Sequence, residues 1–136
     1  MGGKKKPHVS QPQEFNYDTA AANLKKRFEK RRRQRLMLHK KAAGDCAAII
    51  AMIIKDFNPI RIYQWGSLLH PEQFDENSDI DIAIEGVDSA EAWFALIGKA
   101  MDMASFSVDI VDINTVHPLD ADSIRKRGKI VYERKQ

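Results

Sequence analysis

Residues 79–85, Asp-Ile-Asp-Ile-Ala-Ile-Glu, place isoleucine at every second position and acidic or small side chains between. Because successive side chains of a β-strand point to opposite faces of a sheet, this period of two predicts a strand. Asp79 and Asp81 then lie on the same face, with Cα atoms about 7 Å apart. The segment therefore predicts a sheet with one apolar face and one face that carries paired carboxylates.

The rest of the chain alternates between helical and strand patterns. Helices are expected over residues 18–43, 45–57, 90–103 and 122–127. Strands are expected over residues 60–65, 80–85, 106–113 and 130–132. Gly44 and Asp45 are expected to end one helix and cap the next, and Asp88 with Glu91 is expected to cap the helix that starts at residue 90. This order predicts an α/β fold of the α+β type, with a small mixed sheet flanked by helices.

The length of 136 residues indicates one domain, which we divide into three segments. They are a flexible tail over residues 1–17, a basic helical extension over residues 18–43, and a domain over residues 44–136. The single cysteine, Cys46, excludes a disulfide framework and a cysteine-based zinc site, and it favours a cytoplasmic protein. No apolar run approaches the roughly 20 residues of a membrane span, so no membrane association is expected.

Charge is distributed unevenly along the chain. Residues 1–41 carry 13 Lys and Arg against three acidic residues, a net charge of +10, whereas residues 42–136 have a net charge of −7. Ten of the basic residues lie within residues 25–41, which makes this segment a candidate nucleic-acid interface. A solvated helix face is the more common meaning of such a run. Because Phe28 is the only aromatic residue in it, nucleic-acid binding would be electrostatic rather than based on base stacking.

The carboxylates of the central strand suggest a metal site. Two like charges so close repel each other unless a cation lies between them, and Mg²⁺ or Mn²⁺ prefers such oxygen ligands. The strand expected over residues 106–113 adds Asp109 and Asp112, which lie on opposite faces because they are three residues apart. Only one of them can join the site. Three aspartates on neighbouring strands suit the two-metal chemistry of nucleotidyl transfer, although a solvated strand face explains the Asp-x-Asp pair alone equally well.

Gly66 and Ser67 directly follow the expected strand over residues 60–65. Glycine lets the backbone approach a phosphate closely, and the Ser67 hydroxyl and nearby amides are suited to an anion. Alone, the pair is also typical of an ordinary turn at the end of a strand.

The combined pattern is more specific than its parts. Trp65-Gly66-Ser67, eleven further residues, Asp79-x-Asp81 and Asp109 resemble the nucleotidyltransferase fold of the DNA polymerase beta superfamily. The size most resembles its minimal nucleotidyltransferases, and the resemblance covers residues 45–132.

The resemblance implies a role for each of these residues. Asp79 and Asp81 would bind both metal ions, and Asp109 would complete the metal site beside the acceptor and help to deprotonate its hydroxyl. Gly66 and Ser67 would contact the triphosphate of the incoming nucleotide, expected to be ATP. In-line attack on the α-phosphate would release pyrophosphate and leave a nucleoside monophosphate on a protein hydroxyl, a small molecule or an RNA end.

One part of the family pattern is absent. Minimal members usually follow Gly-Ser with Arg, a small residue, a basic residue and Gly, whereas this chain has Leu68, Leu69, His70 and Pro71. A cation expected near the triphosphate is therefore missing. The candidate replacements are His70, Lys99 and Arg125.

The resemblance also implies a partner. Minimal nucleotidyltransferases often work with a separate helical protein, commonly a HEPN-type toxin that they can neutralise by adenylylation, so an antitoxin-like role is expected. An oligomer is compatible with the sequence. Two alternatives stay open: a weak or inactive nucleotidyltransferase-fold module that acts as antitoxin or scaffold, and a nucleic-acid binder that uses residues 25–41.

Overall fold

The computed structural model describes residues 15–135. Most of the expected flexible tail, residues 1–14, lies outside the described residues. The chain divides into two compact units, one that ends at Arg31 and one over Arg32–Gln136. Helix α1 (Tyr17–Phe57) begins in the first unit and ends in the second. The division into three segments stays a prediction.

Helix α1 is continuous over 41 residues, so the predicted break at Gly44 is wrong. Its buried residues, Ala42, Cys46, Ile49 and Ile53, keep a helical spacing across the glycine. One exposed glycine inside a helix costs only about 1 kcal/mol relative to alanine, which the burial of this apolar stripe outweighs. Asp45 caps no new helix; its carboxylate instead accepts a hydrogen bond from the backbone N–H of Ser105, at 2.9 Å.

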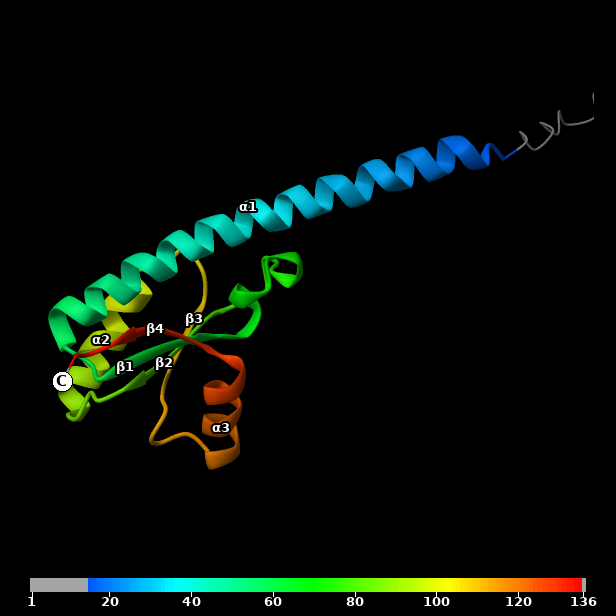
Figure 1. Ribbon diagram of the computed structural model, residues 1–136. Helices are drawn as coiled ribbons and strands as arrows, with labels where there is room; N and C mark the ends of the chain where they lie inside the picture. The colour runs from blue at the N-terminus through cyan, green and yellow to red at the C-terminus, as the bar shows by residue number, and fades with distance from the viewer. Residues whose placement is uncertain (1–14, 136) are drawn as a thin grey trace, which may run out of the picture. The chain divides into compact units, whose positions relative to one another are not determined.

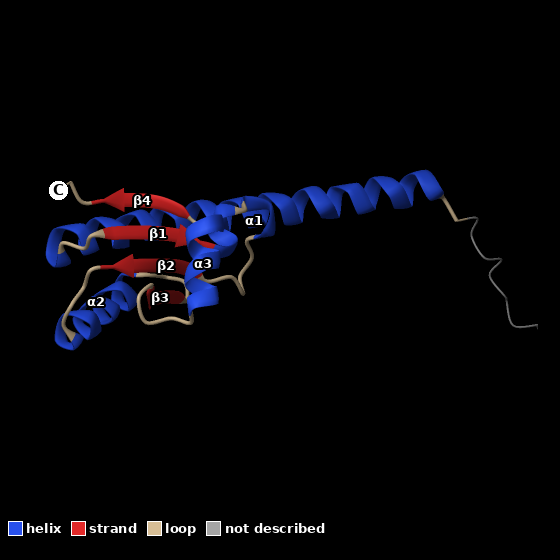
Figure 2. Cartoon of the chain, turned by 60° about the horizontal axis from the view of Figure 1, so that its bottom comes forward, coloured by secondary structure: helices blue, strands red, loops and turns tan. Residues whose placement is uncertain are grey.

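Four strands form one mixed sheet in the unit that starts at Arg32. They are β1 (Arg61–Trp65), β2 (Ile80–Glu85), β3 (Val108–Asp112) and β4 (Lys129–Glu133). Figure 2 shows their order, β3-β2-β1-β4. Strand β1 is antiparallel to β2 and β4, whereas β2 and β3 are parallel. The predicted α+β fold with a small mixed sheet is confirmed.

Different helices pack on the two faces of the sheet (Figure 1). The isoleucine face of β2 is buried under α2 (Ala90–Met103) and the α1 residues of the same unit. The other face packs on α3 (Pro118–Arg127), where Ala121 and Ile124 meet Tyr63 and Ala83. The isoleucines of β2 are at most 1% exposed, so the predicted apolar face of this strand is confirmed.

Two helix starts differ from the expectation. Ser89, not Asp88, caps α2, and its hydroxyl accepts a hydrogen bond from the Ala92 N–H at 3.0 Å. Helix α3 begins at Pro118, four residues before the predicted start, because the His117 ring accepts from the Leu119 N–H and proline suits a first helical turn.

The connection from β1 to β2 contains two short 3₁₀ turns, η1 (Gly66–Leu69) and η2 (Pro71–Gln73). Within residues 15–135, none of the helices combines the length and the apolar character that a membrane span requires.

Candidate functional site

The predicted carboxylates gather on the face of the sheet that α3 covers. The parallel register of β2 and β3 pairs Asp81 with Asp109, and Asp79 directly precedes β2 on the same face. Asp81 is half-buried, whereas Asp79 and Asp109 are exposed. Asp112 lies on the opposite face, level with Ile84, and its carboxylate accepts a hydrogen bond from the Asn114 N–H at 2.9 Å. The structure thus places three of the four aspartates on one face of the sheet.

Burial of the Asp81 carboxyl, together with the smaller effects of the Asp109 and Asp79 charges, raises its pKa from the ordinary value of 3.8 to about 6. Both causes penalise the ionised form, and a bound cation would offset the penalty. The electrostatics of this face therefore match a site for a positive ion.

Three aspartates supply carboxylate oxygens, the ligand type that Mg²⁺ and Mn²⁺ prefer. Among residues 15–135, no three His, Cys, Asp or Glu side chains already converge into a metal-ligating group. Asp79 and Asp109 are exposed and lie on the same face of the sheet as Asp81. The donor chemistry of this face therefore fits a divalent ion.

Gly66 connects the carboxylates to the turn that follows β1. Its φ is +76°, in the left-handed region that favours glycine. A Cβ at this residue would overlap the carboxylate of Asp81. The backbone at the start of η1 thus lies directly against one predicted metal ligand.

A hollow of about 310 Å³ lies beside this glycine, a volume at the lower end of small-molecule sites. It contains both predicted nucleotide-binding residues, Gly66 and Ser67. Its lining is Trp65, Gly66, Ser67, Leu69, His70, Gln73, Ser123 and Arg127. Residues of η1, η2 and one face of α3 therefore line the hollow together.

The three expected replacement cations lie in different places. His70 lines the hollow. Lys99 Nζ instead pairs with Asp56 of α1 at 3.1 Å, and Arg125 is not among the lining residues. The lining cation that the sequence reasoning missed is Arg127. Ser123 and Arg127 lie one helical turn apart on the same face of α3, but this spacing alone does not point to the hollow.

Helix α1 supports the two 3₁₀ turns. His39 Nε2 donates to the carbonyl oxygen of Leu68 in η1, at 2.6 Å. Arg32 Nη2 lies 3.1 Å from Oε1 of Glu72 in η2, with both side chains 62% exposed. The sequence reasoning did not find either contact, because each joins residues at least 29 positions apart.

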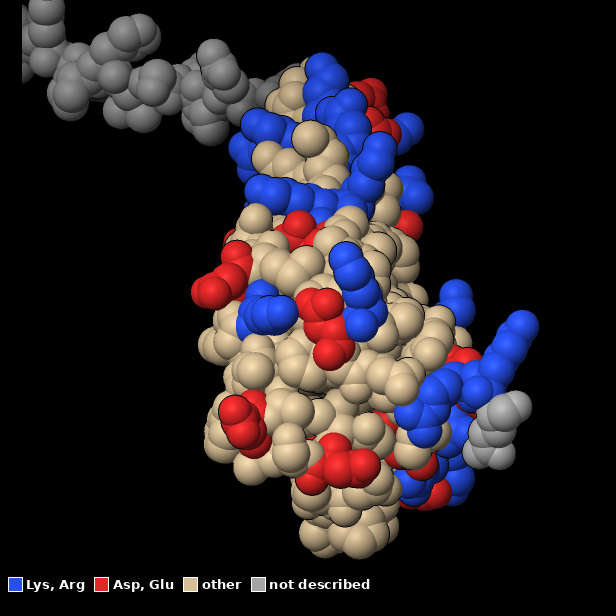
Figure 3. All heavy atoms as spheres, turned by 90° about the vertical axis from the view of Figure 1, so that its left-hand side faces the viewer, with Lys and Arg blue, Asp and Glu red and all other residues tan. Residues whose placement is uncertain are grey.

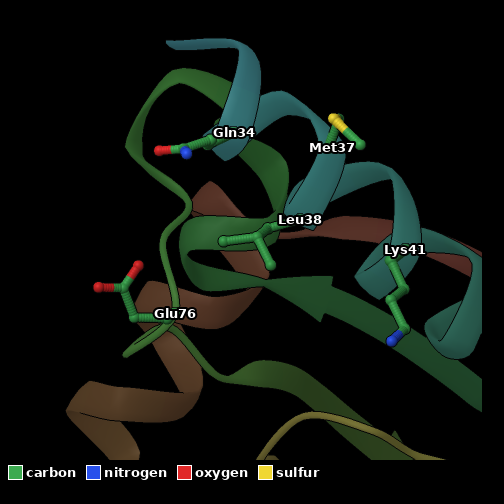
Figure 4. Close-up of a pocket in the computed structure, with 5 residues that line it drawn as sticks. All are labelled: Gln34, Met37, Leu38, Lys41 and Glu76. Carbon is green, nitrogen blue, oxygen red and sulfur yellow. The ribbon is translucent and has the colours of Figure 1, made fainter. Parts of the chain in front are cut away.

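A second hollow, of about 410 Å³, contains none of the predicted site residues (Figure 4). Met37, Leu38 and Lys41 of α1 line it together with Gln34 and Glu76.

The basic segment over residues 25–41 lies entirely within α1. Lys25, Lys26, Arg27, Lys30 and Arg31 of the first unit are all exposed. Figure 3 shows Lys and Arg side chains gathered where α1 lies.

Comparisons with known proteins give a consistent picture. A family model described as Polymerase beta, Nucleotidyltransferase matches residues 47–136. A solved toxin-antitoxin structure with AMP-PNP is 27% identical and has a TM-score of 0.53, over 65% of this chain and 73% of that chain. A toxin-antitoxin structure of MntA-HepT, 23% identical, shows the same fold with a TM-score of 0.52, over 68% of this chain and 73% of that chain. No curated protein matches the chain significantly.

Proposed function

The chain belongs to the polymerase beta nucleotidyltransferase family, and we propose that it transfers a nucleoside monophosphate from a nucleoside triphosphate, expected to be ATP, to an acceptor hydroxyl. One observation carries this proposal. In the sheet, Asp81 of β2 lies level with Asp109 of the neighbouring strand β3, and its carboxylate lies against the backbone of Gly66. The central carboxylate of the proposed metal site therefore lies against the turn proposed to hold phosphate, and nucleotidyl transfer needs both groups close together.

Each residue then has a distinct task. Gly66 and Ser67 would hold the triphosphate, and Asp79 and Asp81 would hold Mg²⁺ or Mn²⁺, with Asp109 completing the set. The bound metal supplies charge neutralisation between the carboxylates and the phosphates. The exposed Asp109 is open to an acceptor and would accept the proton of its hydroxyl. The acceptor oxygen bonds to the α-phosphorus, the bond from that phosphorus to the α–β bridging oxygen breaks, and pyrophosphate leaves.

We further propose an antitoxin-like role with a HEPN-type helical partner, whose hydroxyl group would be the acceptor. The similarity to a toxin-antitoxin structure with AMP-PNP, at 27% identity, supports this proposal.

Label transfer from α-³²P-ATP tests the activity directly. Wild-type protein with Mg²⁺ or Mn²⁺ and host lysate should label an acceptor, and Asp81→Asn should abolish the label because it removes the central carboxylate charge. Asp112→Asn is the matched control, since Asp112 lies on the other face of the sheet and asparagine can still accept the Asn114 hydrogen bond. Equal labelling by Asp81→Asn protein would rule out the proposed site.

A binding module without chemistry is the second candidate, favoured by Leu68–Pro71, where family members carry basic residues. A partner complex that forms and functions equally well with Asp79→Ala and Asp81→Ala, together with no label from any nucleotide, would establish it.

Nucleic-acid binding through residues 25–41 is a third candidate, favoured by the exposed basic side chains of α1. Replacing Lys25, Lys26, Arg27 and Lys30 with Gln should then weaken binding and flatten its dependence on salt. Affinity that is unchanged in this variant would exclude the segment.

A further inference from the structure

We propose that Arg127 is the cation that binds the terminal phosphates of the nucleotide, with Ser123 as a second donor beside it. This proposal rests on the proposed nucleotidyl transfer. It assigns to α3 the phosphate-binding positive charge that the residues directly after Gly66 and Ser67 do not supply.

The η1 turn has no charged side chain to match the charge of a nucleotide. A nucleoside triphosphate brings several negative charges, and η1 offers backbone amides and one hydroxyl at Ser67 but no charged side chain. Arg127 and His70 are the basic residues in the lining of the hollow that contains Gly66 and Ser67.

Helix α3 turns one face toward the sheet and another toward the hollow. Ala121 and Ile124 are buried against the sheet. Ser123 and Arg127, four residues apart, share a different face and both line the hollow. Of the other basic residues in the last turn, Lys126 pairs with Asp122 of the same helix at 2.9 Å, and Arg125 is not among the lining residues.

Backbone contacts at Gly128 fix the end of α3. The Gly128 N–H donates to the carbonyl oxygen of Ile124 at 2.7 Å. A Cβ at Gly128 would lie 3.2 Å from the carbonyl oxygen of Gln64, so the backbone packs closely on β1. The antiparallel register then pairs Lys129 with Gln64. The chain just before Lys129 thus runs beside the chain just after Gln64, which places Arg127 next to the Gly66 turn.

The guanidinium group of Arg127 makes no ion pair within residues 15–135, so no carboxylate of the described chain already neutralises its charge. A guanidinium presents a planar set of donors that matches two phosphate oxygens at once. Arg127 is therefore suited to a phosphate group.

The test is nucleotide affinity as a function of phosphate number, measured by calorimetry with ATP, ADP and AMP in Mg²⁺. In wild-type protein, we expect affinity to rise with each phosphate. Arg127→Ala should weaken ATP binding about 10- to 100-fold, the range for loss of a charged hydrogen-bonding group, and leave AMP binding within about twofold. Arg127→Lys should recover part of the loss, and KM for ATP should rise more than kcat falls.

Arg125→Ala is the matched control, because it removes the same charge from the same helical turn. It should bind ATP as wild-type protein does. Thermal unfolding of each variant checks that it is folded, and because Arg127 is exposed, its replacement should change the free energy of unfolding by less than about 0.5 kcal/mol.

Two failures are distinguishable. If wild-type protein prefers ATP to AMP and Arg127→Ala keeps the full preference, the role of Arg127 is wrong and the proposed transfer stands. If wild-type protein binds no nucleotide, the proposed transfer fails, and the role of Arg127 fails with it.

Discussion

Gly66 packs its backbone directly against the carboxylate of Asp81, in a conformation with φ of +76°. The Cγ of that carboxylate would lie 3.0 Å from a Cβ at residue 66. The turn expected to hold phosphate and the carboxylate expected to hold metal are therefore parts of one packed unit, and a change in either one affects the other.

Gly66→Ala should destabilise the protein, because alanine is strained at this φ and its methyl group would overlap Asp81. We expect a loss of about 1–3 kcal/mol in the free energy of unfolding, measured by urea denaturation, together with weaker nucleotide binding. Gly98→Ala is the control, since a Cβ there meets nothing within 4 Å. Equal stability of the two variants would contradict the close packing of Gly66 on Asp81.

The raised pKa of Asp81 predicts a pH dependence of stability in protein freed of divalent metal with EDTA. Folding favours the protonated carboxyl, because its pKa is 3.8 when unperturbed and about 6 in the folded protein. Asp81 therefore does not lower the free energy of unfolding below about pH 4. Between pH 4 and 6 it lowers this free energy increasingly, and above pH 6 by a constant amount. Asp81→Asn should melt at a higher temperature than wild-type protein at pH 7.5 and at the same temperature near pH 4.

The same pair of proteins tests the metal site without any assay of activity. Mg²⁺ added at pH 7.5 should raise the melting temperature of wild-type protein, because it binds the folded state and offsets the repulsion among the carboxylates. It should have no such effect on Asp81→Asn. A rise of the same size in both proteins would place the bound metal elsewhere.

The bond from His39 to Leu68 predicts that α1 affects the nucleotide site. His39→Ala leaves the Leu68 carbonyl without its partner and should cost about 1–2 kcal/mol in the free energy of unfolding. Because η1 then loses a support, KM for ATP should rise. Arg32→Ala removes an exposed ion pair and should change stability by less than about 0.5 kcal/mol. An unchanged KM in His39→Ala protein would show that η1 keeps its form without α1.

Gly44→Ala distinguishes a continuous α1 from two helices that meet at this residue. In a continuous helix, alanine should raise the free energy of unfolding by about 0.5–1 kcal/mol, since no atom lies within 4 Å of the new methyl group. If Gly44 ended a helix with positive φ, the same substitution would lower stability. Chemical denaturation gives the sign.

Local patterns predicted the strands and the face of the sheet that carries the carboxylates. Ile80, Ile82 and Ile84 alternate with Asp81, and this alternation determines which side chains are buried whatever the rest of the chain does. The same rule left Asp109 and Asp112 as alternatives on opposite faces of the neighbouring strand, and the resemblance to the polymerase beta superfamily chose Asp109. The period of one strand is therefore enough for the Asp79 and Asp81 pair but not for the third carboxylate.

The parts that were missed depend on tertiary contacts. Arg127 reaches the hollow because Gly128 packs on Gln64, a contact across 64 residues that no local pattern carries. Gly44 resembles a helix end, but the burial of Cys46 and Ile49 on the same stripe as Ala42 keeps the helix continuous. In both cases tertiary packing decides between two local structures that are equally compatible with the local sequence.

The position of β3 at one edge of the sheet has a consequence for selectivity. Asp109 lies exposed on this edge strand. In the proposed reaction, the sheet of the described chain has no further strand beyond β3 that would limit the size of the molecule that brings its hydroxyl to Asp109. Discrimination among acceptors would come from how a whole surface docks beside the edge, so a new target would be acquired by changing the docking surface while the reacting groups stay the same.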